Sequence, residues 1–234
     1  MTITPLPIEL PQLSTSLRTF AADEPDSWQP VLDLAVAAFG WHTVGGIFVY
    51  ENVTTDWKQP KFEGYPVDAR PGGIHVPIAD LNQDGKADFV ALVSQQYEHV
   101  VAFLNRGAGK GFRAETIFRA VVPVWGSSGI EMVDMDKDGD LDLLMSNGDS
   151  LDDFTVRPFH GVSWFENEGS YPWKQHDLAI MPGVHRAQAA DLDGDGDLDV
   201  VAAALLPNAE HPAFQLLERQ GNLPPYTSLG WTEP

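Results

Sequence analysis

Hydrophobic and polar residues alternate in short runs, and the runs are separated by turns rich in Gly, Pro, Asn and Asp. Runs of this length and period predict β-strands. The clearest set of four runs covers residues 74–79, 89–93, 100–105 and 112–119. Two similar sets follow, at 130–133, 142–145, 161–166 and 174–180, and at 186–190, 199–205, 214–218 and 226–231. The pattern therefore predicts an all-β protein built from repeated four-stranded units.

A weaker set of runs precedes these three, at residues 31–37, 46–52 and 62–67. A lone four-stranded sheet cannot bury both of its faces, so sheets in series must stack on their neighbours, as propeller blades do. We therefore expect a β-propeller-type array of about four four-stranded blades. It would form a single domain over residues 21–234, after an irregular N-terminal arm at 1–20. The expected repeats are 21–72, 73–127, 128–182 and 183–234.

One acidic motif occurs three times, each time between the first and second strand of a set. It reads D-x-[DN]-x-D-G-x-x-D, is followed by two apolar residues, and begins at Asp80, Asp134 and Asp191. The starting points are 54 and 57 residues apart. A motif that recurs at a regular interval of this size indicates a repeat architecture.

The spacing of this motif suits a hard dication. Oxygen ligands at positions 1, 3 and 5 can converge, the Gly at position 6 permits a sharp turn, and the carbonyl at position 7 and carboxylate at position 9 complete the shell. Calcium fits such a flexible oxygen set better than magnesium. We therefore expect about three Ca²⁺ ions. The predicted ligands are Asp80, Asn82, Asp84, the Lys86 carbonyl and Asp88; Asp134, Asp136, Asp138, the Asp140 carbonyl and Asp142; and Asp191, Asp193, Asp195, the Asp197 carbonyl and Asp199.

The side chains of Asp140 and Asp197 are expected to point to solvent. An EF-hand is excluded, because position 12 is Ala91, Met145 or Ala202 instead of Glu and the flanking residues have a strand pattern. The alternative that the loops are acidic turns without a metal stays open.

These three loops and their apolar exits resemble the FG-GAP and VCBS repeat families, including the calcium-bearing blades of integrin α-subunit propellers. The resemblance covers about residues 30–220. It implies a propeller, usually with about seven blades, an extracellular or periplasmic location, and a role in adhesion or sugar binding. Some related propellers are lectins or polysaccharide lyases. Since this chain has four repeats, it could close as a small ring, remain an open arc, pair with a second copy, or be completed by a partner.

The charge of the chain limits its partners. There are 34 acidic and 14 basic residues, which give a net charge of −20. Such a surface repels phosphate backbones and anionic lipid surfaces, so we expect no nucleic-acid partner and no membrane insertion. The first 20 residues have no long apolar run and predict no signal peptide. Three constitutive calcium sites nevertheless favour an extracytoplasmic location.

Two further groups of residues are candidates for ligand binding. A His precedes each expected third strand, at positions 42, 99, 160 and 211, and the longest of these loops, 147–160, contains both Arg157 and His160. His75, Glu131 and Arg186 occupy matching positions on first strands and are expected to meet near the propeller axis.

The histidines could instead be similar loop residues inherited by related repeats, and the long loop a surface excursion held by its own hydrogen bonds. The three strand residues could be the polar groups that a solvated channel needs. The chain has no Cys and no recognisable nucleophile or phosphate-binding motif. The sequence therefore favours a module that binds a protein or glycan. The alternatives are a polysaccharide-lyase-like enzyme or a subunit of a larger assembly.

Overall fold

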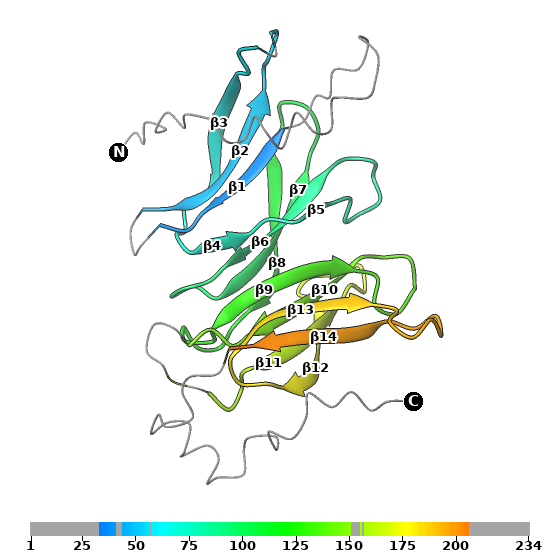
Figure 1. Ribbon diagram of the computed structural model, residues 1–234. Helices are drawn as coiled ribbons and strands as arrows, with labels where there is room; N and C mark the ends of the chain where they lie inside the picture. The colour runs from blue at the N-terminus through cyan, green and yellow to red at the C-terminus, as the bar shows by residue number, and fades with distance from the viewer. Residues whose placement is uncertain (1–32, 41–43, 57, 151–154, 156, 206–234) are drawn as a thin grey trace.

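The computed structural model describes residues 33–40, 44–56, 58–150, 155 and 157–205. In these residues all of the regular secondary structure is β-strand, and the strands form four antiparallel sheets that follow the order of the chain (Figure 1). The all-β expectation is confirmed. No helix long and apolar enough to cross a membrane occurs in this part of the chain.

Each sheet is an antiparallel meander in which consecutive strands are hydrogen-bonded neighbours, except that β4 and β5 of the second sheet both pair with β6. The first sheet contains β1 (Leu34–Ala38), β2 (Gly46–Asn52) and β3 (Phe62–Asp68). The second contains β4 (Gly73–His75), β5 (Ile78–Ala79), β6 (Asp88–Val93), β7 (His99–Asn105) and β8 (Phe112–Arg119). The third contains β9 (Ser127–Val133), β10 (Asp142–Asn147), β11 (Gly161–Glu166) and β12 (Lys174–Ile180), and the fourth contains β13 (Val184–Ala190) and β14 (Asp199–Ala204).

The predicted strands agree closely with the observed ones, with one internal difference. The expected single strand at 74–79 is interrupted, and its two parts, β4 and β5, both pair with β6. Pro77 lies in the interruption and has no N–H to donate to the ladder, although its carbonyl still accepts from Val90 N at 3.0 Å. The predicted strands at 214–218 and 226–231 and the predicted N-terminal arm lie outside the described residues.

The second sheet is buried on both of its faces. Val90 and Leu92 of β6 belong to a cluster that includes Leu143 and Met145 of the third sheet. Alternate residues of the same strand, Phe89, Ala91 and Val93, belong to another cluster, which includes Ile47 and Val49 of the first sheet. Because both faces are covered, β6 needs apolar residues at consecutive positions and not only at every second one.

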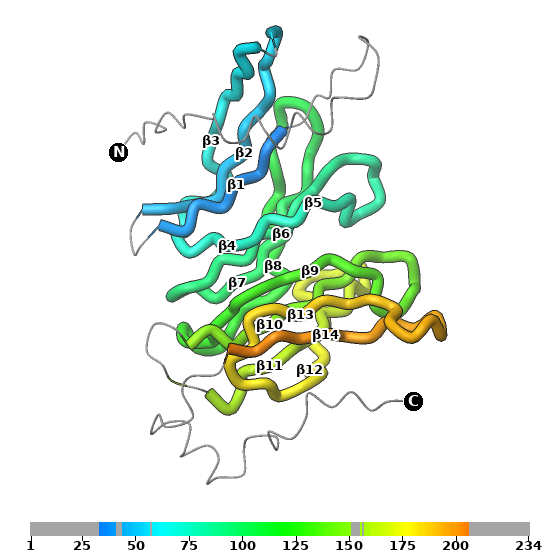
Figure 2. The backbone as a smooth tube through the Cα atoms, in the orientation of Figure 1, coloured from blue at the N-terminus to red at the C-terminus, as the bar shows by residue number. Residues whose placement is uncertain are grey.

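A third cluster joins the third and fourth sheets, through Leu144 and Val162 on one side and Val184 and Ala187 on the other. The sheets therefore pack face to face in series, as the tube through the backbone shows (Figure 2). The described residues do not close into a ring, and only the second and third sheets have a described strand for all four positions of the expected unit.

The two-sided burial predicts which side chains control stability. Leu143 is 0% exposed between the second and third sheets. Leu143→Ala should lower the free energy of unfolding by about 2–5 kcal/mol, because it removes buried methyl groups and leaves a cavity. Chemical denaturation measures this change. Val121→Ala is the control, since Val121 is 88% exposed, and an equal effect of the two substitutions would contradict the packing described.

Candidate functional site

The three acidic loops lie at the same end of consecutive sheets. They connect β5 to β6, β9 to β10, and β13 to β14, and they appear on the right-hand side of Figure 1. Each loop leaves the first strand of its sheet and enters the second, as the sequence predicted. The motif is therefore presented once by each of three stacked sheets.

Main-chain hydrogen bonds fold each loop around its own carboxylates. In the second loop, Asp134 Oδ2 accepts from Gly139 N at 3.1 Å, Asp136 Oδ1 from Asp138 N at 3.2 Å, and Asp138 Oδ1 from Asp140 N at 2.8 Å. The same three bonds, from positions 6, 5 and 7 of the motif to positions 1, 3 and 5, recur in the first and third loops. The loops thus have one common backbone design.

The turn at position 6 needs Gly for its conformation. Gly139 has a φ of +98°, a left-handed value that side chains rarely adopt. The residue at position 4 is also left-handed, with φ of 55° at Gln83 and 62° at Lys137. The motif predicted the first of these turns. It did not reveal the second, because position 4 has no fixed residue type.

The second and third loops gather carboxylates closely enough to hold a metal ion. Single carboxylate oxygens of Asp134, Asp136 and Asp138 all lie within 4.8 Å of one another, and the same is true of Asp191, Asp193 and Asp195. Asp134 Oδ1 is buried and has no hydrogen-bond partner. Three close anions repel one another, and a buried oxygen without a partner is costly, so a bound cation would relieve both penalties. An all-oxygen donor set suits calcium.

The first loop differs because it contains a cation of its own. Asn82 replaces one carboxylate, and Lys86 Nζ lies 2.6 Å from Asp84 Oδ2. The hydrogen bond from Lys86 holds the pKa of Asp84 below its usual value. The first loop therefore has less negative charge to offer a metal ion than the other two.

The carboxylate at position 9 joins its loop to the third strand of the sheet. Asp142 Oδ2 accepts from Met135 N at 3.1 Å, and its Oδ1 accepts from Asn167 N at 2.8 Å. Asp88 makes the same pair of bonds, to Leu81 N at 3.0 Å and Asn105 N at 2.7 Å. Asp199 likewise accepts from Leu192 N, and Asp33, at the same place in the first sheet, accepts from Asn52 N.

Burial raises the pKa of Asp88 and of Asp142, and the main-chain donors oppose that rise. The two clusters of three carboxylates do not include the ninth position. The structure therefore gives this residue a structural role that the ligand spacing did not reveal. Its role as a metal ligand stays a prediction.

Neighbouring loops contact each other through positions 4 and 7. Gln83 Nε2 donates to Asp140 Oδ1 at 2.6 Å and to Gly139 O at 3.1 Å, and Lys137 Nζ lies 3.3 Å from Asp197 Oδ1. Asp140, whose side chain was expected to point to solvent, thus contacts the preceding loop through an exposed hydrogen bond. Asp197 pairs with Lys137 while its side chain remains 93% exposed.

The residues expected near the axis join the first strands of adjacent sheets. Arg186 Nη1 donates to Ile130 O at 2.8 Å, and Glu131 Oε2 accepts from Ala189 N at 3.2 Å. Burial and, secondarily, the charge of Arg186 lower the pKa of His75, and a hydrogen bond to the Ile130 main chain opposes them. These side chains satisfy main-chain groups between β4, β9 and β13. A role for His75 and Arg186 in ligand binding stays a prediction.

Two of the four histidines expected in the opposite loops, His99 and His160, lie in described residues, and these two do not share one exposed surface. His160 is 0% exposed and packs edge-on against Phe159, so it cannot touch a ligand from solvent. His99 lies beside Arg70. The other two, at positions 42 and 211, lie outside the described residues.

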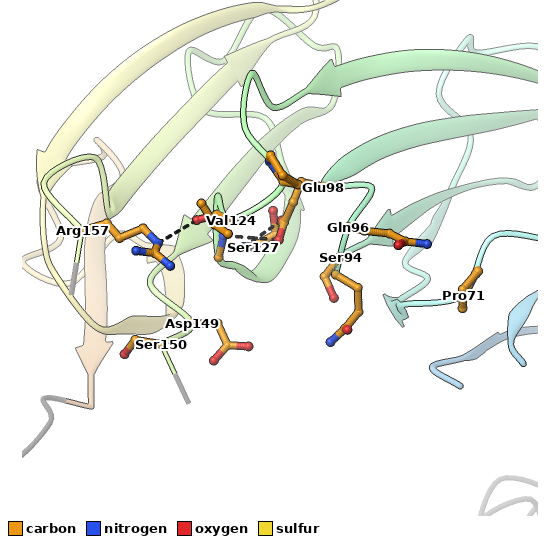
Figure 3. Close-up of a pocket in the computed structure, with 12 residues that line it drawn as sticks. Pro71, Ser94, Gln96, Glu98, Val124, Ser127, Asp149, Ser150 and Arg157 are labelled. Atoms are coloured by element: carbon orange, nitrogen blue, oxygen red, sulfur yellow. Dashed lines mark hydrogen bonds between the residues drawn. The ribbon is translucent and has the colours of Figure 1, made fainter. Parts of the chain in front are cut away.

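Arg157, in contrast, lines a cavity of about 240 Å³ at this end of the sheets (Figure 3). Three loops that are far apart in sequence form it, together with Pro71: the β6–β7 turn, the β8–β9 loop and the β10–β11 loop. The polar lining residues are Ser94, Gln95, Gln96, Glu98, Ser127, Asp149, Ser150 and Arg157.

Glu98 is the buried acid of this cavity, with 4% of the residue exposed. Its Oε2 accepts from Ser127 N at 3.0 Å and its Oε1 from Gly126 N at 3.3 Å, while its main-chain carbonyl accepts from Ala120 N at 3.0 Å. Burial raises the pKa of Glu98 to about 7, although the bonds from Ser127 and Gly126 oppose the rise. Glu98 therefore holds both ends of the 120–126 loop.

The comparisons with known proteins identify the repeat. A family model described as FG-GAP-like repeat matches residues 80–145 and 147–202, slightly more than half of the chain. No curated protein and no solved structure gives a significant match.

Substitutions in the second loop can separate the structural role of the aspartate at position 9 from metal binding. Asp142→Asn should lower the free energy of unfolding by about 1–3 kcal/mol in EDTA, because an amide cannot accept from both Met135 and Asn167. Asp136→Asn, at an exposed position of the same loop, should change stability little in EDTA. Denaturation of both variants in EDTA measures the difference, and an unchanged Asp142→Asn protein would contradict the structural role.

The raised pKa of Glu98 predicts that the stability of the protein depends on pH. Its pKa is near 4.5 in the unfolded chain and about 7 in the folded protein, so the folded state favours the protonated form. Glu98 therefore contributes about 3 kcal/mol to the free energy of unfolding. This contribution is fully present below about pH 4.5 and is lost as the pH rises through 7. Glu98→Gln should remove that part of the pH dependence in denaturation curves at pH 5 and 8. The exposed Glu63→Gln serves as control, and identical profiles for wild type and Glu98→Gln would exclude the assignment.

Proposed function

The chain belongs to the FG-GAP-like repeat family, and from that premise we propose that it is a calcium-stabilised β-propeller-type module. Its role is to bind a protein or glycan partner outside the cytoplasm. The serial stacking of sheets and the position of the acidic loops between first and second strands support this proposal.

The observation that carries the calcium proposal is the buried oxygen Asp134 Oδ1, which has no hydrogen-bond partner in a loop where two more carboxylates approach it. A calcium ion among Asp134, Asp136 and Asp138 would replace the missing partner, and an ion among Asp191, Asp193 and Asp195 would neutralise the third loop. The first loop binds more weakly, because Lys86 already neutralises Asp84.

Calcium in these loops stabilises the fold and takes no part in a reaction. An ion that binds only the folded chain adds to stability by linkage. The axial residues Glu131 and Arg186 already bind main-chain groups of adjacent strands, which favours a binding module over an enzyme. The net charge of −20 favours protein or neutral glycan partners over nucleic acid.

Thermal unfolding with and without calcium tests the proposal. Calcium at about 100 times its Kd contributes about 2.7 kcal/mol per site, so it should raise Tm by roughly 5–10 °C for each tightly bound ion. Calorimetric titration should show two tighter ions and one weaker ion. The double variant Asp136→Asn with Asp193→Asn should lose most of the rise in Tm.

The matched control is Asp56→Asn with Glu63→Gln, which removes the same amount of charge from the first sheet and should keep the full response. If calcium leaves Tm unchanged in the wild-type protein, the loops are acidic turns without a metal and the proposal fails.

A further inference from the structure

The second acidic loop is held in part by the loop that precedes it. Gln83, at position 4 of the first loop, donates from Nε2 to Asp140 Oδ1 at 2.6 Å and to Gly139 O at 3.1 Å. Both partners are oxygens that can only accept, so only the NH₂ group of the Gln83 amide fits this place. The first loop therefore contacts the second loop at its positions 6 and 7.

These two positions orient the carboxylates of the second loop. Gly139 N donates to Asp134 Oδ2 at 3.1 Å. Asp140 N donates to Asp138 Oδ1 at 2.8 Å. Because Gly139 O and Asp140 N belong to one planar peptide group, that group is fixed by Gln83 on one side and by Asp138 on the other. Gln83 thus acts on the part of the loop that orients the metal-binding oxygens, although the motif gives position 4 no place among the ligands.

The first loop can support its neighbour because its own groups hold it together. Lys86 Nζ lies 2.6 Å from Asp84 Oδ2, and Asn82 Nδ2 donates to the same oxygen at 3.3 Å. Asp80 Oδ1 accepts from Asp84 N at 3.1 Å, and its Oδ2 accepts from Gly85 N at 2.8 Å. The lysine supplies to the first loop the positive charge that a metal ion would supply to the second. The shape of the first loop therefore does not depend on calcium.

The corresponding contact between the second and third loops is weaker. Lys137 Nζ lies 3.3 Å from Asp197 Oδ1, and the side chain of Asp197 is 93% exposed. An exposed ion pair contributes little to stability and is screened by salt. Gln83, in contrast, also bonds a main-chain oxygen of its neighbour. The third loop can therefore serve as an internal reference for the second.

We propose that Gln83 is a positioning residue for the cation site of the second loop. By holding the Gly139–Asp140 peptide group in place, it raises the affinity of the three carboxylates of that loop for calcium. A loop whose carboxylates are already oriented loses less conformational freedom when the ion binds. The inference rests on the proposed function, since it concerns the same site, and it assigns a role in that site to a residue of a different loop.

Amide NMR spectroscopy on the full-length protein, titrated with calcium, tests the inference. The glycines at position 6 report each loop separately, Gly139 for the second loop and Gly196 for the third. Gln83→Met keeps the length and the neutrality of the side chain but cannot donate. It should raise the calcium concentration at the midpoint of the Gly139 shift about fivefold, the effect of one exposed hydrogen bond. The midpoint of the Gly196 shift should not change.

A second variant separates the lost contact from backbone strain. Gln83 has a left-handed φ of 55°, which Asn adopts more readily than most residues. Gln83→Asn shortens the amide by one methylene group and should weaken the second loop as Gln83→Met does. The matched control is Gln59→Met, at an exposed position of the β2–β3 connection, which should leave both midpoints as in the wild type.

The positioning itself is measured in EDTA by amide relaxation. The order parameter of the Asp140 amide should be lower in Gln83→Met than in the wild type, because the peptide group has lost one of its two anchors. Gln59→Met should leave this order parameter unchanged.

Three results would overturn the inference: an unchanged Gly139 midpoint in both Gln83 variants, an equal rise of the Gly139 and Gly196 midpoints, or a loss of affinity without a lower order parameter at Asp140. If neither glycine signal of the wild-type protein responds to calcium, the proposed function fails and this inference fails with it. If the wild type responds while the Gln83 variants behave as the control does, this inference alone fails.

Discussion

Burial of both faces of the second and third sheets is the constraint on which this structure depends. A sheet whose second strand reads Asp-Phe-Val-Ala-Leu-Val has no face that can be left in water. It must therefore lie between two neighbours, and the even-numbered and odd-numbered residues of β6 do pack in opposite directions. In the described residues, the connections between the first and second strands of a sheet lie at one end of the stack, and those between the second and third strands lie at the other. The acidic loops and the polar cavity are separated by this geometry.

The aspartate at the end of each acidic loop connects the core to the loop. Its carboxylate is buried in the second and third sheets, and there it bonds the start of the loop on one side and the third strand on the other. In the first sheet, Asp33 accepts a hydrogen bond from Asn52 N at the corresponding place, although the sequence before Asp33 lacks the acidic motif. Because this hydrogen bond occurs without the motif, it is part of the fold of the repeat. The capacity to bind a metal ion would come from the residues at positions 1, 3 and 5 of the motif.

The sequence pattern was sufficient to predict most of the described strands and the Gly turn of each acidic loop. The predictions for 112–119, 161–166 and 174–180 match β8, β11 and β12, because alternation and flanking turns are local signals. The Gly turn at position 6 was predictable for the same reason. The division of the first strand at Pro77 could have been anticipated from the missing N–H.

The cavity could not have been predicted from local pattern. Glu98 stands in an ordinary polar turn, and its partners Gly126 and Ser127 are about 30 residues further along the chain. The same reason applies to His160, which packs against Phe159 of its own loop, while Phe159 stacks on Trp125 of the β8–β9 loop. The length of its loop made Arg157 a candidate for ligand binding, and Arg157 lines the cavity.

The contacts between successive acidic loops have a direction. Position 4 of one loop always reaches position 7 of the next, from Gln83 to Asp140 and from Lys137 to Asp197. The second loop has both a donor at position 4, Lys137, and an acceptor at position 7, Asp140, whereas the third loop has Gly194 at position 4 and the first has Lys86 at position 7. A duplicated copy of the second repeat would therefore find a partner on each side without any change to the residues that join it to its neighbours. The number of sheets is thus free to grow at the middle of the array, while Gly194 and Lys86 end the chain of contacts within the described residues.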